Sequence, residues 1–485
     1  MVFNSVTFLV FLAITLSLYY RLGHRGQNWL LLIASYFFYG WWDFRFVFLL
    51  LFTSFFDYFC ALWIDQEQNP GKRKMFLSFS IIVNMAVLCI FKYYNFFADS
   101  LRHLLGVLGI NASFPILHVI LPVGISFYTF LSMSYTIDVY RKELPASRNP
   151  IDFLLYVSYF PHLVAGPIVR ASYLLPQCQA TRVINRTEVV NGLWLMLMGY
   201  VKKVVIADQL GQIVTWGFSG AASPFADLNS WFIVYAFAFQ IYGDFAGYSD
   251  IARGLAKVMG FELIENFRAP YLVTNPSNFW RNWHISLSTW LRDYLYIPLG
   301  GNRGSPAKTY RNLMITMLLG GLWHGAGIAY VIWGFYHGLL LAVHRWWGEH
   351  FGKDKSPSPD MSDARPDAWH RLKATAMVLI FFHITCIGWL IFRAGALKTT
   401  SEQWQAITSY LKGMTAFGHW AGLTPLAGGI VALSLLGLLF QWKHEAMNHF
   451  SQWRTSRQVA GAALALALIT VLGVFEGSQF IYFQF

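Results

Sequence analysis

Apolar runs close to the length of a membrane span recur from one end of this chain to the other, separated by short polar connections. A helix of about 20 apolar residues is long enough to cross the hydrocarbon core of a bilayer. Only 12% of the residues are charged, whereas soluble domains contain roughly 25%. We therefore predict an all-α polytopic integral membrane protein, with residues 1–485 forming one membrane-embedded domain.

We expect about 12 transmembrane helices, counting broken or re-entrant ones. The clearest expected spans cover residues 2–20, 29–42, 44–64, 75–97, 192–207, 231–245, 374–392, 426–440 and 459–475. Residues 65–74 and 352–367 are expected to be polar loops, the second of them cytoplasmic.

Two apolar segments contain helix breakers. Pro122 and Gly124 interrupt Ile116–Glu143, and two prolines and a glycine interrupt Tyr159–Arg170. Non-helical backbone persists at membrane depth only where protein or a water-filled cavity receives its polar groups. These segments therefore suggest a chamber that the helices surround.

The formal net charge is +12, and the basic residues cluster in the short connections between apolar runs. This distribution follows the positive-inside bias, and placing the basic connections inside puts the N-terminus outside. The first span is expected to be retained, because no positive charge precedes it and no small-residue cleavage site follows it. The expected partner of these residues is the lipid bilayer rather than nucleic acid, because the chain has no basic stripe and no RNA-binding motif.

The stretch Asn278–His344 concentrates ionisable residues among tryptophan, leucine and isoleucine. His324 lies in GGLWHGAG, between glycines that permit close approach of backbone or ligand. A neutral imidazole there could act as the general base that takes a proton from an acceptor hydroxyl. The competing interpretation is a histidine that only hydrogen-bonds neighbouring helices.

His284 lies in WRNWHISLSTWLRD. Helical spacing predicts that Arg281, His284, Leu287 and Ser288 share one face. Such a face could orient an acceptor or bind a carbonyl oxygen. Alternatively, the helix lies along the membrane surface and presents Arg and His to lipid headgroups.

Arg292 and Asp293 are expected to pair with each other or to brace the chamber. No bound metal is expected, because neither a histidine pair with i,i+4 spacing nor a nearby carboxylate accompanies His324, His337 and His344. The glycine-rich loop Gly300–Gly304 could approach a phosphate but lacks the P-loop pattern.

NFWRNWHISLSTWLRDYLYIPLGG and GLWHGAGIAYVIWGFYHG together closely resemble the membrane-bound O-acyltransferase family. LPVGISFYTF, YFPHLVAGPIVR, YGDFAGYSDIARG and the terminal FIYFQF extend the resemblance over the whole chain. Within the family, length and the FIYFQF end favour the bacterial alginate O-acetylating branch, which is related to the D-alanyl-transferring members.

The resemblance implies a ring of helices around a thin centre, with His324 and His284 as the catalytic pair. Candidate substrate-binding residues around them are Asn278, Arg281, Trp283, Ser288, Arg292, Asp293 and Trp323. It implies no tightly bound cofactor and acetyl-CoA or another acyl thioester as donor. It also implies partner proteins of the acetyltransferase or esterase type, either periplasmic or anchored in the membrane. The alternative is a non-catalytic scaffold or transporter in a polysaccharide-secretion complex.

Overall fold

A computed structural model describes residues 1–219, 230–351, 368–397, 399–415, 425–443, 449–475 and 480–481. These residues form helices joined by turns and extended segments, and no strand occurs among them. The expected all-α class is confirmed. The expected polar loop at residues 352–367 and most of the terminal FIYFQF lie outside the described residues.

Within those ranges, five helical stretches are long and apolar enough to cross a membrane: Arg45–Gln66, Pro70–Val107, Arg186–Gly217, Ala368–Ala394 and Thr455–Leu472. Two shorter apolar helices, Val6–Tyr19 and Ala427–Trp442, accompany them. The chain is thus a polytopic membrane protein, whereas the count of about 12 spans stays a prediction.

Contacts group the chain into two compact units, Met1–Val204 with Phe245–Glu265 and Asn448–Phe483, and Val205–Asp244 with Asn266–Met447 and Gln484–Phe485. The expectation of one domain stays a prediction.

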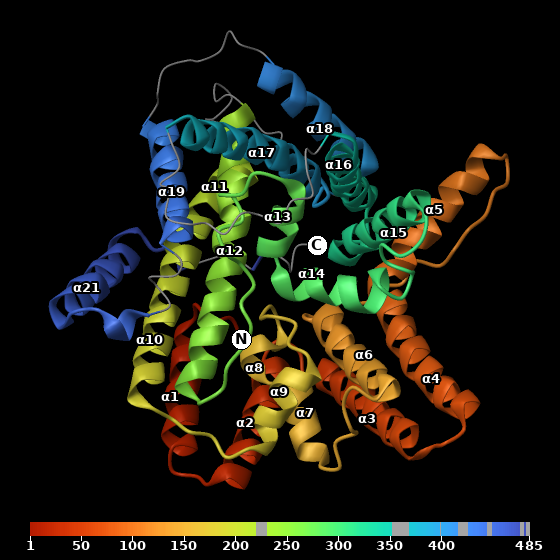
Figure 1. The fold of residues 1–485 in the computed structure, drawn as a ribbon, viewed down its shortest axis with the longest axis vertical. Helices are drawn as coiled ribbons and strands as arrows, with labels where there is room; N and C mark the ends of the chain where they lie inside the picture. The colour runs from red at the N-terminus through yellow and green to blue at the C-terminus, as the bar shows by residue number, and fades with distance from the viewer. Residues whose placement is uncertain are drawn as a thin grey trace. The chain divides into compact units, whose positions relative to one another are not determined.

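The helices of the first unit are seen from red to yellow and in dark blue in Figure 1. They are α1 (Val6–Tyr19), α2 (His24–Gly40), α3 (Arg45–Gln66), α4 (Pro70–Leu88), α5 (Tyr94–Val107), α6 (Ile125–Arg141), α7 (Pro150–Ser158), α8 (Phe160–Leu163), α9 (Ala171–Gln179), α10 (Arg186–Tyr200) and α21 (Thr455–Leu472).

Two expected boundaries in this unit are wrong. Residues 70–74 are helical rather than looped, because Asn69 caps α4 by accepting a hydrogen bond from the Gly71 amide at 2.8 Å and Pro70 occupies the first turn. The expected span 75–97 also continues, through the π-helical segment η1 (Cys89–Tyr93) into α5. A π-turn adds a residue without ending the helix.

The two interruptions expected from proline and glycine are present, and they touch. Gly124 precedes α6 in a left-handed conformation, with φ 76°. A Cβ atom at Gly124 would lie 2.7 Å from the carbonyl oxygen of Leu163, which ends the one-turn helix α8. Glycine is therefore required here both for its backbone angle and for the close approach of the two broken segments.

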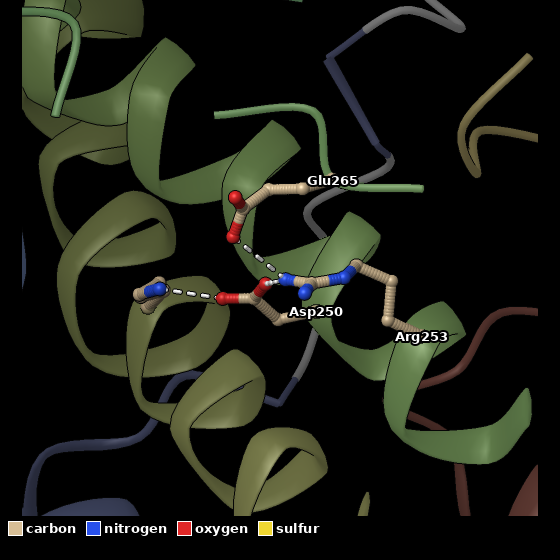
Figure 2. A network of polar contacts seen from close by, with 4 residues as sticks. Asp250, Arg253 and Glu265 are labelled. Carbon is tan, nitrogen blue, oxygen red and sulfur yellow. Dashed lines mark hydrogen bonds and ion pairs between the residues drawn. The ribbon is translucent and has the colours of Figure 1, made fainter. Parts of the chain in front are cut away.

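A buried ionic network lies in the first unit and involves α12 (Ser230–Val258). Asp250 accepts a bond from Lys202 at 2.5 Å and another from Arg253 at 3.3 Å, and Arg253 also reaches Glu265 at 3.2 Å. Figure 2 shows the Arg253 guanidinium lying between the carboxylates of Asp250 and Glu265. Each of these four side chains is at most 12% exposed, so opposite charges compensate one another where water is scarce.

The second unit carries the stretch that concentrates the candidate residues. Its helices are α11 (Asp208–Gly217), α13 (Pro276–Asn282), α14 (Ile285–Leu291), α15 (Pro306–His324), α16 (Ile328–Phe351), α17 (Ala368–Ala394), α18 (Thr400–Thr415) and α19 (Pro425–Trp442), with the π-helical segment η3 (Arg292–Tyr296) after α14. Helices η2 (Val201–Ala207) and α12 run through both units.

Helices α15 and α16 lie side by side (Figure 1), and α17 packs on α16. Glycines set the close approach of the first pair. A Cβ atom on Gly334 would overlap the carbonyl oxygen of Met317, and one on Gly321 would overlap that of Tyr330. Small residues at a crossing let two helix backbones come together, and this crossing places the end of α15 against α16.

Candidate functional site

His324 is the last residue of α15 and is 3% exposed. Three aromatic rings meet it edge to face: Trp323 at 5.0 Å, Trp333 at 5.1 Å and Phe392 at 5.3 Å between ring centroids. These three residues, called here the aromatic box, come from α15, α16 and α17. The packing of three helices therefore fixes the position of the imidazole and excludes water from it.

The glycines around His324 make room for protein. The ring of Tyr330 fills the position that a Cβ atom of Gly325 would take, and Gly321 contacts the backbone of Tyr330. The sequence interpretation that glycines permit a close approach is confirmed, and the group that approaches in the described residues is Tyr330.

His284 lies between two short helices rather than within one. Helix α13 ends at Asn282, Trp283 is extended with φ −105° and ψ 126°, and His284 is left-handed with φ 44° and ψ 55° before α14 begins at Ile285. The predicted helical face shared by Arg281, His284, Leu287 and Ser288 is therefore wrong. Tertiary hydrogen bonds cause the break, because the Ile285 amide donates to the carbonyl oxygen of Asn266 at 3.0 Å instead of continuing α13.

The structure brings the two histidines together. Their ring centroids are 6.3 Å apart, and His284 is completely buried. Trp323 contacts both, at 5.8 Å from His284 and 5.0 Å from His324. A general base must come within about 3 Å of the proton it removes, so two rings at this separation can both reach one small substrate group.

Three other candidate residues lie on α13, on α14 or between them, close to His284 in the chain. Trp283 is 1% exposed and stacks on Phe279 at 5.7 Å. The Ser288 hydroxyl donates to the Trp283 carbonyl oxygen at 3.1 Å. The Asn278 amide donates to the side chain of Asn275 at 2.9 Å in the first turn of α13. These bonds shape the backbone that leads into His284.

The charged candidates occupy a different environment. Arg281 is exposed at the end of α13. Arg292 and Asp293 form the expected pair, with Nε 2.6 Å from one carboxylate oxygen, and the Arg292 side chain is 58% exposed. Because this pair is open to the surroundings of the protein, its electrostatic contribution to stability is small.

His337 is buried beside Trp333 of the aromatic box. Its ring lies 4.8 Å from Trp333 and 5.8 Å from Phe279, and it stacks on the latter with an interplanar angle of 10°. No group of three or more His, Cys, Asp or Glu residues able to hold a metal was found in the described residues. The absence of a metal stays an expectation, and the packing explains His337 as part of an aromatic layer.

Sequence reasoning did not single out Trp333 or Phe392. Trp333 lies on α16 and Phe392 on α17, whereas His324 ends α15. Spacing along one helix therefore does not predict that these residues meet. The available signal was the density of aromatic residues in YVIWGFYHG, next to a buried histidine. Aromatic side chains prefer such edge-to-face contacts.

The arrangement suits group-transfer reactions in which water would otherwise compete as the acceptor. Two buried imidazoles can accept and return protons, and a site closed to water protects a reactive intermediate from hydrolysis. Burial also strengthens any hydrogen bond made to charge that develops during reaction.

Comparison with known proteins identifies the family of the chain. Residues 31–387, which include both histidines, match the family model described as MBOAT, membrane-bound O-acyltransferase family. The chain is 42% identical over 475 residues to a protein named probable alginate O-acetylase AlgI from Pseudomonas aeruginosa, covering 95% of this chain and 85% of that protein.

Two further relatives are more distant. A peptidoglycan O-acetyltransferase of Helicobacter pylori is 35% identical over 432 residues, covering 82% of this chain and 78% of that protein. A teichoic acid D-alanyltransferase of Bacillus subtilis is 27% identical over 280 residues, covering 56% and 68%. The first two names describe O-acetylation, of alginate and of peptidoglycan, and the third describes D-alanyl transfer to teichoic acid.

Proposed function

The chain belongs to the membrane-bound O-acyltransferase family, and on that premise we propose that it moves an acetyl group across the inner membrane. The donor is a cytoplasmic acyl thioester, acetyl-CoA, and the destination is O-acetylation of an exported polysaccharide such as alginate. Membership makes the chain an O-acyltransferase. The assignment to alginate is supported by 42% identity over 95% of the chain.

One observation carries the assignment of the site: the two buried imidazoles of His284 and His324, with centroids 6.3 Å apart. His324 removes the proton of the acceptor hydroxyl as its oxygen attacks the thioester carbonyl carbon. The C–S bond then breaks, and the thiolate that leaves takes up the proton held by His324. His284 stabilises the carbonyl oxygen or orients the acceptor, a role that is largest in the transition state.

The proposal includes partners. Acetyl delivered to the far side of the membrane must be placed on a polymer, so we expect acetyltransferase or esterase-like proteins of a polysaccharide-modification system. The periplasmic N-terminus belongs to this same proposal, because it follows from the distribution of basic residues.

A complementation experiment in the native host tests the function. Strains lacking the chromosomal gene would express wild type, His324→Ala or His284→Ala at matched membrane levels, and ester-linked acetate on the isolated surface polysaccharide would be measured. We expect His324→Ala to abolish acetate and His284→Ala to reduce it strongly, since a general base contributes about 10²–10⁴-fold. His350→Ala is the matched control, because His350 is exposed at the end of α16.

Acetate at wild-type level with His324→Ala would contradict the catalytic assignment and leave a membrane scaffold as the better interpretation. Supplying labelled acetyl-CoA to membranes and searching peptides for an acyl-histidine separates direct displacement from a covalent route. Label on the His324 peptide would replace the single displacement with two steps.

A further inference from the structure

The backbone of His284 adopts a conformation that residues with a side chain rarely take. Its φ of 44° and ψ of 55° are left-handed, a strained conformation for a residue other than glycine. Such a conformation persists only where the surroundings enforce it. The residues that enforce it therefore decide where the imidazole lies.

His284 also occupies the N-cap position of α14, yet its side chain makes no capping hydrogen bond. The first amides of a helix have no partner within the helix and usually bind the side chain of the N-cap residue. In α14, a residue outside the helix provides the capping hydrogen bond instead.

Asn266 supplies the cap instead. Its carbonyl oxygen accepts from the Ile285 amide at 3.0 Å, and its side-chain Oδ1 accepts from the Ser286 amide at 3.2 Å. On the other side of His284, the Arg268 amide donates to the carbonyl oxygen of Asn282 at 3.0 Å. Asn266 is 1% exposed, so water does not compete for these amides.

We propose that Asn266 is a positioning residue for the acyl-transfer reaction. By capping α14 from outside the helix, it holds His284 in the left-handed conformation and releases the imidazole from capping. The ring then lies against Trp323 and His324, at 5.8 Å and 6.3 Å. This inference rests on the proposed function, because it assigns a role in the reaction that His284 and His324 perform.

A double-mutant cycle tests the inference with the full-length protein in membranes. Wild type, Asn266→Ala, His284→Ala and the double variant would be compared for kcat and KM of acetyl transfer from acetyl-CoA. We expect Asn266→Ala, which removes the Oδ1 acceptor of the Ser286 amide but keeps the backbone carbonyl, to lower kcat about ten-fold with little change in KM, because the imidazole is then less well positioned. In the His284→Ala background the same change should have no further effect.

Two more variants separate positioning from general stability. Asn266→Asp keeps an oxygen acceptor for Ser286 and should restore most of kcat. Asn185→Ala is the matched control, since the Asn185 side chain caps α10 by accepting from the Glu188 amide at 2.8 Å. It should lower the unfolding temperature while leaving kcat unchanged. Multiplicative effects of Asn266→Ala and His284→Ala would overturn the inference.

A second readout does not depend on activity. Modification of histidines by diethyl pyrocarbonate, followed by peptide mass spectrometry, reports access to each imidazole. In Asn266→Ala we expect His284 to react several-fold faster, whereas His337, which is 1% exposed in wild type, should not change. An unchanged His284 rate would overturn the positioning role. If the wild type transferred no acetyl but Asn266→Ala still made His284 react faster, the positioning role of Asn266 would stand and the proposed function would be refuted.

Discussion

His284 and His324 face each other across 6.3 Å, one from a left-handed turn between two short helices and the other from the end of α15. Neither position depends on the local helix alone. The turn depends on hydrogen bonds that Asn266 accepts, and the end of α15 depends on its crossing with α16 and on the aromatic box. The site is therefore sensitive to changes in residues that carry no chemistry.

Replacing Trp333 tests the aromatic box. Trp333 is 1% exposed and contacts His324 and Phe392, at 5.1 Å and 5.2 Å. Trp333→Ala would leave a cavity and cost about 3–5 kcal/mol, and acetyl transfer should fall with it. Trp333→Phe should retain more of both. The unfolding temperature in detergent and the transfer rate in membranes measure the two effects.

Trp347→Ala provides the comparison for this prediction, because Trp347 lies on the same helix and is 59% exposed. It should alter neither stability nor rate by much. Equal losses from Trp333→Ala and Trp347→Ala would show that the box does not hold His324.

Replacing Gly334 tests the helix crossing. A Cβ atom at this position would overlap the carbonyl oxygen of Met317, so Gly334→Ala should push α15 away from α16. Overpacking of this kind costs about 1–3 kcal/mol, and the displacement should reduce acetyl transfer through His324. Thermal unfolding followed by tryptophan fluorescence would measure the cost.

Gly348→Ala is the matched change in α16, since nothing lies within 4 Å of a Cβ atom placed there. Alanine is the better helix former by about 1 kcal/mol, so this variant should be as stable as wild type or more so. Destabilisation by Gly348→Ala as large as that by Gly334→Ala would contradict the account of the crossing.

Replacing Asp250 tests the buried ionic network. Its carboxylate binds both Lys202 and Arg253 (Figure 2), and its side chain is 12% exposed. Asp250→Ala removes the anion that these two cations share, and breaking a buried pair costs about 3–5 kcal/mol. We expect a large fall in unfolding temperature and in the amount of protein recovered from membranes.

Asp43→Ala removes one partner of an exposed pair, because Arg45 is 63% exposed. Solvent screens such a pair, so this variant should unfold close to the wild-type temperature. If Asp250→Ala unfolded there as well, the network would not contribute to stability.

Much of the fold follows from local pattern. Apolar length predicted α1, α2 and α3 to within a few residues, and Pro122 with Gly124 marked the start of α6. These features depend on residues adjacent in sequence. Asn69-Pro70 was a readable start signal for α4, since asparagine caps helices and proline fits their first turn.

The conformation around His284 could not be predicted in the same way. WRNWHISLS has helical spacing, and no residue in it indicates that His284 would be left-handed. The break depends on amides that bind Asn266, a residue distant in sequence, and tertiary bonds of this kind override local propensity. The box around His324 likewise needs α16 and α17 in place before Trp333 and Phe392 can be identified.

The most direct measurement is the initial rate of acetyl transfer from radiolabelled acetyl-CoA in inverted inner-membrane vesicles, which expose the cytoplasmic face. Vesicles with equal amounts of wild type and His324→Ala, each with its polysaccharide-modification partners, would be compared. We expect transfer by wild type and a rate at least about 100-fold lower for His324→Ala. Equal rates for the two proteins would contradict the claim that the buried histidine pair performs acyl transfer.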